Sequence, residues 1–120
     1  MRAATLVVLC CTAFLAGGIS PVARADCGKD QQGEVWCGMG QCERDQYGKV
    51  FCSRYLYGGA MQGSDGKVRC GRGQCARDQY ANVYCSKAVA GGALRNSEGE
   101  VRCAGGCERG STDYCIEGKK

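Results

Sequence analysis

The residues with the widest chemical repertoire in this chain are its cysteines. The 120-residue sequence has 12 Cys and no His. Reduced cysteines bind metals or carry redox chemistry, while oxidised cysteines form disulfides. The closest spacings in the cysteine-rich part are C-x3-C and C-x4-C, and no C-x-x-C of a thioredoxin-type or zinc-knuckle site occurs. The spacing therefore favours disulfides, with thiolate coordination of zinc or copper(I) as an alternative that requires reduced cysteines.

The N-terminal segment predicts export, which decides between these two states. A basic start at Met1–Arg2 precedes an uncharged apolar run over residues 3–19, and Ala23-Arg24-Ala25 forms an A-x-A cleavage site. A membrane anchor is the alternative, but a run of 17 residues is at the lower limit for a span. We expect residues 1–25 to be a removable signal peptide, no membrane span after cleavage, and a secreted or periplasmic protein.

The composition of residues 26–120 predicts a disulfide scaffold and argues against an enzyme. Ten cysteines remain in these 95 residues, a density typical of small domains whose core is too small to fold alone. Histidine, the usual general base and metal ligand, is absent from the sequence. Removal of Arg2 and Arg24 lowers the formal charge from +4 to +2, which is too small to indicate nucleic-acid binding. We therefore expect no catalytic residue, no metal site and no cofactor.

The cysteine-rich domain, residues 26–120, is internally repeated. Residues 37–69 match residues 70–102 with a 33-residue period, and a shortened copy spans 103–115. Within each repeat the string [GA]-x-V-x-C recurs at alternating steps of 15 and 18 residues. Each string follows a four-residue turn candidate, which predicts five β-hairpins, here numbered 1 to 5, whose turns span 30–33, 45–48, 63–66, 78–81 and 96–99. Ala81 stands where the other four turns have Gly and is expected to carry about 1 kcal/mol of strain.

Hairpin register predicts which cysteines face each other. Counting outward from the turns places Cys27 opposite Cys37, Cys42 opposite Cys52, and Cys75 opposite Cys85. Ala60 and Ala93 stand opposite the remaining hairpin cysteines, which must find partners elsewhere. The preferred disulfides are 27–37, 42–52, 75–85, 107–115 and 70–103, and a rival set closes the short loops 37–42, 70–75 and 103–107.

Two sets of side chains alternate on the predicted strands. A basic residue lies opposite valine beside the cysteines in the pairs Lys29/Val35, Arg44/Val50 and Arg77/Val83, and Arg109 continues the basic position. The other side forms a candidate binding face, Trp36, Phe51, Arg69, Tyr84 and Arg102, which suits sugar rings or stacked bases unless it only packs against neighbouring strands.

The unit CERDQYGKVFC at residues 42–52 resembles a repeat of short exported cysteine-repeat proteins of Gram-negative bacteria, C-x2-D-x2-G-x-V-x-C. The resemblance covers most of residues 27–115 and implies an exported bacterial protein without naming a functional residue. Together these patterns predict a small disulfide-rich, mainly β protein of tandem hairpins with little helix. Its expected function is that of a non-enzymatic structural or interaction module with an unknown protein or glycan partner. Two alternatives stay open: a secreted inhibitor or toxin-like effector that uses the loop Leu56-Tyr57, and a cysteine-based metal-binding protein.

Overall fold

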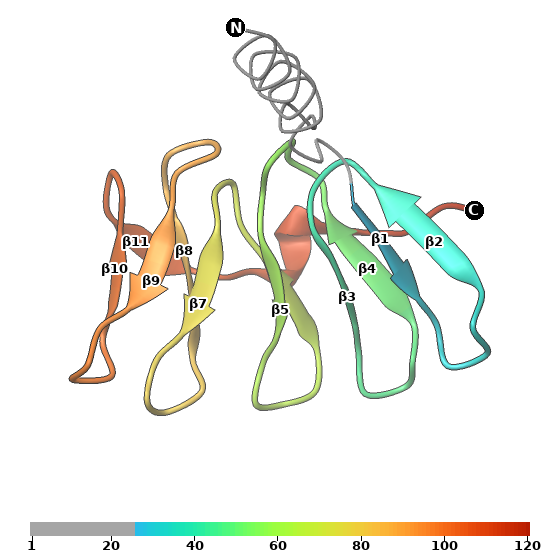
Figure 1. Ribbon diagram of the computed structural model, residues 1–120, viewed down its shortest axis with the longest axis horizontal. Helices are drawn as coiled ribbons and strands as arrows, with labels where there is room; N and C mark the ends of the chain where they lie inside the picture. The colour runs from blue at the N-terminus through green and yellow to red at the C-terminus, as the bar shows by residue number, and fades with distance from the viewer. Residues whose placement is uncertain (1–25) are drawn as a thin grey trace, which may run out of the picture.

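The computed structural model describes residues 26–120 and contains five β-hairpins placed side by side (Figure 1). This architecture confirms the predicted small, disulfide-rich, mainly β fold; the predicted signal peptide lies outside the described residues. The hairpins are formed by β1 (Asp26–Lys29) and β2 (Val35–Gly38), β3 (Cys42–Arg44) and β4 (Val50–Ser53), β5 (Ala60–Gln62) and β6 (Val68–Cys70), β7 (Cys75–Arg77) and β8 (Val83–Ser86), and β9 (Ala93–Arg95) and β10 (Val101–Cys103). The remaining elements are β11 (Cys107–Arg109), the 3-10 helix η1 (Thr112–Tyr114) and β12 (Cys115–Glu117).

The hairpin turns form because an acidic or amide side chain starts each of four turns. In hairpin 2, Asp45 Oδ1 accepts hydrogen bonds from the backbone N–H groups of Tyr47 and Lys49, both at 2.9 Å. Gly48 then adopts a φ of +83°, the left-handed conformation that a three-residue hairpin loop requires. Ala81 adopts the same conformation with a φ of +65°, as the sequence predicts.

The predicted register and three of the five predicted disulfides are confirmed. Cysteines face each other in hairpins 1, 2 and 4 and are bonded as 27–37, 42–52 and 75–85. Their Cα–Cα distances are 4.0, 3.9 and 4.0 Å, close to the short approach of directly opposed strand residues. Ala60 and Ala93 lie opposite Cys70 and Cys103, also as predicted.

The predicted pairs 70–103 and 107–115 are wrong. Cys70 is bonded to Cys115 and Cys103 to Cys107, so only one pair of the rival set, 103–107, is present. A 70–103 bond is prevented because hairpin 4 lies between hairpins 3 and 5 (Figure 1). The segment 107–115 forms no hairpin of its own, since it has Gly110 and Asp113 at the places where hairpin 2 has Asp45 and Gly48.

Consecutive hairpins stack on each other, and glycine lets them approach closely. We call the side of a hairpin that carries its cysteines the cysteine side and the other its opposite side. In hairpin 2, Cys52 and Val50 lie on the cysteine side and Phe51 on the opposite side. A β-carbon added to Gly38, which follows Cys37, would lie 2.7 Å from Sγ of Cys52 in hairpin 2. One added to Gly71, after hairpin 3, would lie 2.6 Å from Sγ of Cys85 in hairpin 4. The buried core between hairpins is accordingly small, and most of it is valine, alanine and cysteine: Val50, Cys52, Ala60, Val68, Cys70, Ala76, Val83 and Cys85.

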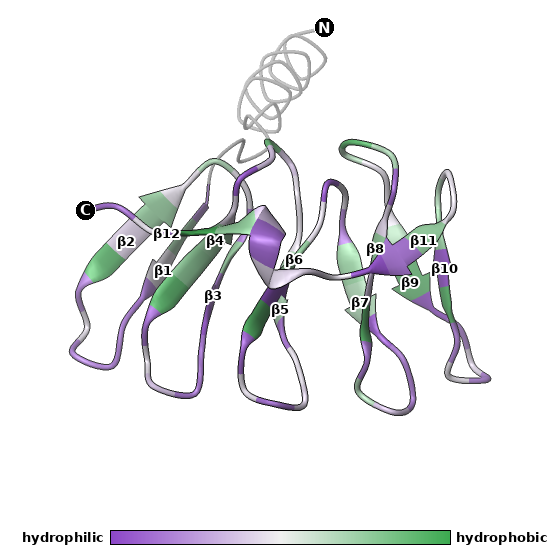
Figure 2. Cartoon of the chain, turned by 180° about the vertical axis from the view of Figure 1, so that it is seen from behind, coloured by the Kyte–Doolittle hydropathy of each residue, from purple (hydrophilic) through white to green (hydrophobic). Residues whose placement is uncertain are grey.

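The C-terminal segment runs back along the stack, which the sequence analysis did not predict. We call residues 107–120 the C-terminal strap; it crosses the side of the molecule seen in Figure 2. The strap pairs antiparallel with the second strand of four hairpins in turn, through β11 with β8, Ser111 with Cys70, β12 with β4 and Lys119 with Cys37. It therefore ties together hairpins that share no β-ladder with one another.

No helix within residues 26–120 is both long and apolar enough to cross a membrane.

Candidate functional site: the grooves between hairpins

Two corresponding grooves lie between hairpins 1 and 2 and between hairpins 4 and 5. Groove A, between hairpins 1 and 2, has a volume of about 210 Å³, and groove C, between hairpins 4 and 5, about 300 Å³. Corresponding positions line both: Asp30 and Asp78, Gln31 and Gln79, Trp36 and Tyr84, Gly48 and Gly99, Lys49 and Glu100, and Val50 and Val101. Each groove thus combines an aromatic ring with a carboxylate and an amide.

Each groove also has one exposed tyrosine, contributed by a hairpin turn. Tyr47 lines groove A from hairpin 2, and Tyr80 lines groove C from hairpin 4. Tyr47 is 73% exposed and Tyr80 is 72% exposed, so both rings are in contact with solvent. From the sequence, both were expected only as turn residues, although their recurrence in Asp-Gln-Tyr was the signal that could have found them.

A third groove lies between hairpins 2 and 3. Groove B has a volume of about 170 Å³ and includes Asp45, Phe51, Lys67 and Val68, again at corresponding positions, together with Thr112 and Cys115 of the strap. Phe51 also packs against the buried cluster of Ala60, Val68 and Cys70. Its ring therefore contributes to the core as well as to the groove.

The structure does not bring the five candidate binding residues together on one face. Trp36, Phe51 and Tyr84 each line a different groove. Arg69 forms a 2.7 Å ion pair with Asp65 of its own turn. Arg102 lies on the opposite side of hairpin 5, at the end of the stack, with 76% of its side chain exposed. A ligand would therefore meet the aromatic rings one groove at a time.

A cation lies over each of the three groove rings. Lys120 Nζ is 5.1 Å from the Trp36 ring centroid, and Arg109 Cζ is 5.3 Å from that of Tyr84. Lys49 Nζ is 5.7 Å from the Phe51 centroid. Such contacts stabilise a ring electrostatically. Since Lys120 and Arg109 belong to the C-terminal strap, the strap helps to hold the rings of grooves A and C.

Hydrogen bonds fix the aspartates of grooves A and C. Trp36 Nε1 donates to Asp30 Oδ2 at 2.9 Å, and this bond is the largest cause of a lowered Asp30 pKa. Burial raises the pKa of Asp78, but the backbone N–H groups of Asn82 and Tyr80 outweigh it, so the net pKa is lowered. Lys120 has a raised pKa because it pairs with Glu34, at 2.7 Å. The carboxylates of Asp30 and Asp78 are therefore held as anions that orient groove residues.

The predicted basic positions are confirmed in register, with one correction. Lys29, Arg44 and Arg77 lie opposite Val35, Val50 and Val83. Arg109 does not continue this row, because β11 places it opposite Tyr84, on the opposite side of hairpin 4.

The ten cysteines of residues 26–120 are all joined in disulfides, so none of them offers a thiolate. Within the same residues, no group of three or more His, Cys, Asp or Glu side chains is placed to hold a metal ion. Comparisons with protein-family models, curated proteins and solved structures found no match.

Proposed function

We propose that the protein is an exported, non-enzymatic interaction module that binds a partner in the grooves between its hairpins. The observation that carries this proposal is the recurrence of aspartate, glutamine and an aromatic ring at corresponding places in grooves A and C. Export is supported by the five intramolecular disulfides, which are typical of oxidising compartments. The predicted signal peptide over residues 1–25 is part of the same proposal.

The groove chemistry suits a sugar ring. Aromatic faces stack on the apolar C–H face of a sugar, and carboxylate and amide groups hydrogen-bond its hydroxyls. Asp30 Oδ1 already accepts two backbone hydrogen bonds, from Gln32 and Glu34, so its position does not depend on a ligand. The rim tyrosines, Tyr47 and Tyr80, are exposed, so both rings are accessible to a bound sugar. We therefore favour a glycan over other partners.

The single tryptophan gives a direct test. Trp36 is the only Trp of the chain and lines groove A. We expect its fluorescence to change on titration with at least one of cello-, chito- or malto-oligosaccharides. Tyr47→Ala should weaken that response severalfold, while Tyr80→Ala, the same change at the rim of groove C, should leave it unchanged. Absence of any response at millimolar sugar, or an equal effect of both substitutions, would contradict a glycan site in groove A.

A secreted inhibitor is a second candidate, supported by one loop. Tyr57, in the loop after hairpin 2, has a φ of +62°, and Ala90, 33 residues later, has one of +64°. The two loops thus share a backbone shape but carry different side chains, Arg-Tyr-Leu-Tyr at 54–57 and Lys-Ala-Val-Ala at 87–90. Leu56 is 37% exposed. Loss of an inhibitory activity in Leu56→Ala, with Val89→Ala unaffected, would favour this function over glycan binding.

A further inference from the structure

The two ends of the hairpin stack expose different sides. Hairpin 1 exposes its cysteine side, where Val35 is 48% exposed, whereas the corresponding Val50 and Val83 inside the stack are 2% and 1% exposed. Hairpin 5 exposes its opposite side, where Leu94 is 79% exposed. Inside the stack, these two kinds of surface cover each other: the opposite side of hairpin 3 receives the cysteine side of hairpin 4.

Hairpin 5 repeats hairpin 3 at this surface. Leu94 and Arg102 stand where hairpin 3 has Met61 and Arg69. The residue directly after each hairpin makes the same backbone contact, with Ala104 N donating to Gly92 O at 2.9 Å and Gly71 N to Gly59 O at 3.0 Å.

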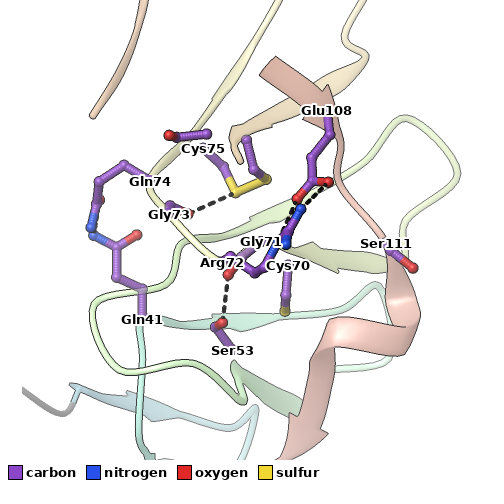
Figure 3. Close-up of a disulfide and its surroundings, with 12 residues drawn as sticks. Gln41, Ser53, Cys70, Gly71, Arg72, Gly73, Gln74, Cys75, Glu108 and Ser111 are labelled. Atoms are coloured by element: carbon purple, nitrogen blue, oxygen red, sulfur yellow. Dashed lines mark hydrogen bonds and ion pairs between the residues drawn. A yellow bond between two sulfur atoms is a disulfide. The ribbon is translucent and has the colours of Figure 1, made fainter. Parts of the chain in front are cut away.

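A serine contact completes the correspondence between positions 71 and 104. The Gly71 carbonyl accepts a 2.8 Å hydrogen bond from Ser53 Oγ (Figure 3), and the Ala104 carbonyl accepts one from Ser86 Oγ. Positions 71 and 104 therefore make the same two backbone contacts, one through the N–H group and one through the carbonyl.

The side chains at positions 71 and 104 differ by one β-carbon. The connection that follows also differs, because it is one residue shorter after hairpin 5 and Gly105 and Gly106 have φ of +76° and +91°. A β-carbon on Gly71 would lie 2.6 Å from Sγ of Cys85 and 3.2 Å from Sγ of Cys75, and so would displace the disulfide of hairpin 4. Position 104 holds alanine, whose β-carbon occupies the place that the disulfide of a following hairpin would need. Stacking of another hairpin on hairpin 5 is thus blocked where stacking on hairpin 3 is allowed.

We propose that the two ends of the stack are complementary surfaces, and that the β-carbon of Ala104 prevents a second copy of this chain from docking head to tail on hairpin 5. The partner surface would be the cysteine side of hairpin 1, which repeats the side that hairpin 4 presents to hairpin 3. A head-to-tail contact of this kind is heterologous, so it builds rings where the rotation between copies closes and open filaments where it does not. Repeat arrays need a distinct terminal repeat for this reason.

The test compares the exported chain with Ala104→Gly by light scattering after gel filtration over a range of concentrations. The wild-type protein should keep the mass of one chain. Ala104→Gly should show a mass that rises with concentration to at least two chains, with an unchanged circular dichroism spectrum.

A second substitution supplies the control. A β-carbon on Gly92 would meet nothing within 4 Å in its own chain, but at the corresponding Gly59 it would lie 2.6 Å from the backbone nitrogen of Cys75 in the next hairpin. The double variant Ala104→Gly/Gly92→Ala should therefore return to one chain. A folded Ala104→Gly protein that stays at the mass of one chain would overturn the proposal. Equal association of the double variant would also overturn it. Neither readout depends on sugar binding.

Discussion

Hairpins 2 and 3 are neighbours in the stack but are crosslinked in different ways. In hairpin 2 the disulfide joins its own two strands, Cys42 and Cys52, ten residues apart. In hairpin 3 alanine replaces one of these cysteines, and Cys70 is bonded to Cys115 of the strap, 45 residues away. The first crosslink holds one hairpin closed, whereas the second fixes the position of the strap along the stack. Local crosslinks therefore define the hairpins and a long one maintains their arrangement.

Polar contacts add to the long crosslink around hairpin 3. Arg72, just after hairpin 3, forms a two-pronged ion pair with Glu108 of β11, at 3.0 and 2.8 Å (Figure 3). This pairing raises the pKa of Arg72. The ring of Tyr55, in the loop between hairpins 2 and 3, meets the ring of Tyr114 in the strap edge to face at 5.3 Å. The strap is thus held by two contacts that precede Cys115 as well as by the disulfide itself.

The largest loss of stability is expected when both kinds of crosslink are removed together. Five disulfides that each contribute about 2–4 kcal/mol together match or exceed the whole stability of a typical domain, about 5–15 kcal/mol. Because the core of valines and alanines is small, full reduction and alkylation should abolish the β-type circular dichroism and the protease resistance. A reduced, alkylated chain that keeps both would show that packing alone holds the fold.

Removing one crosslink of each kind should separate their contributions. In the chain-entropy model, a 45-residue loop is worth about 4 kcal/mol and a ten-residue loop about 2.7 kcal/mol. The variant Cys70→Ala/Cys115→Ala should therefore lose more free energy of unfolding in urea than Cys42→Ala/Cys52→Ala. It should also speed amide hydrogen exchange at Ser111 and Gly118, whose N–H groups bond across to hairpins 3 and 2. An equal or larger loss in the hairpin 2 variant would contradict the proposed division of roles.

A smaller effect is expected where hairpins 3 and 4 meet. Gly71→Ala places a β-carbon against the Cys75–Cys85 disulfide and should cost about 1–3 kcal/mol, as overpacking does. Gly92→Ala, at the free end of the stack, should change the free energy of unfolding by less than about 0.5 kcal/mol. Chemical denaturation of both variants measures the difference, and similar losses would argue against close stacking as the reason for Gly71.

The smallest expected effect concerns the turn of hairpin 4. Ala81 is left-handed, so Ala81→Gly should raise the free energy of unfolding by about 1 kcal/mol. Gly48→Ala in hairpin 2 should be destabilising, because its β-carbon would also lie 2.7 Å from Cβ of Gln31 in hairpin 1. Hairpin 3 has Ser64 where hairpin 1 has Gln31, which explains why alanine is tolerated at position 81. Destabilisation by Ala81→Gly would refute this account of the turn.

The parts of this fold that could be predicted from the sequence are those fixed by local turns. Asp45 and Gly48 set the register of hairpin 2, and that register alone places Cys42 opposite Cys52. The strap could not be predicted, because β11 and β12 are three residues each and their partners lie in hairpins 4 and 2. The error over Cys70 has the same origin, since its partner belongs to the strap. The grooves were missed as well, because they arise from stacking and not from a shared strand face.

Peptide mapping without reduction tests most directly the claim that the C-terminal strap is tied to hairpin 3. Trypsin cuts after Arg69, Arg72, Arg102, Arg109 and Lys119. The structure predicts that the fragment Cys70–Arg72 is recovered bonded to Gly110–Lys119, and that Cys103–Arg109 carries an internal disulfide. Recovery of Cys70–Arg72 bonded to Cys103–Arg109 would contradict the strap and restore hairpin-to-hairpin pairing.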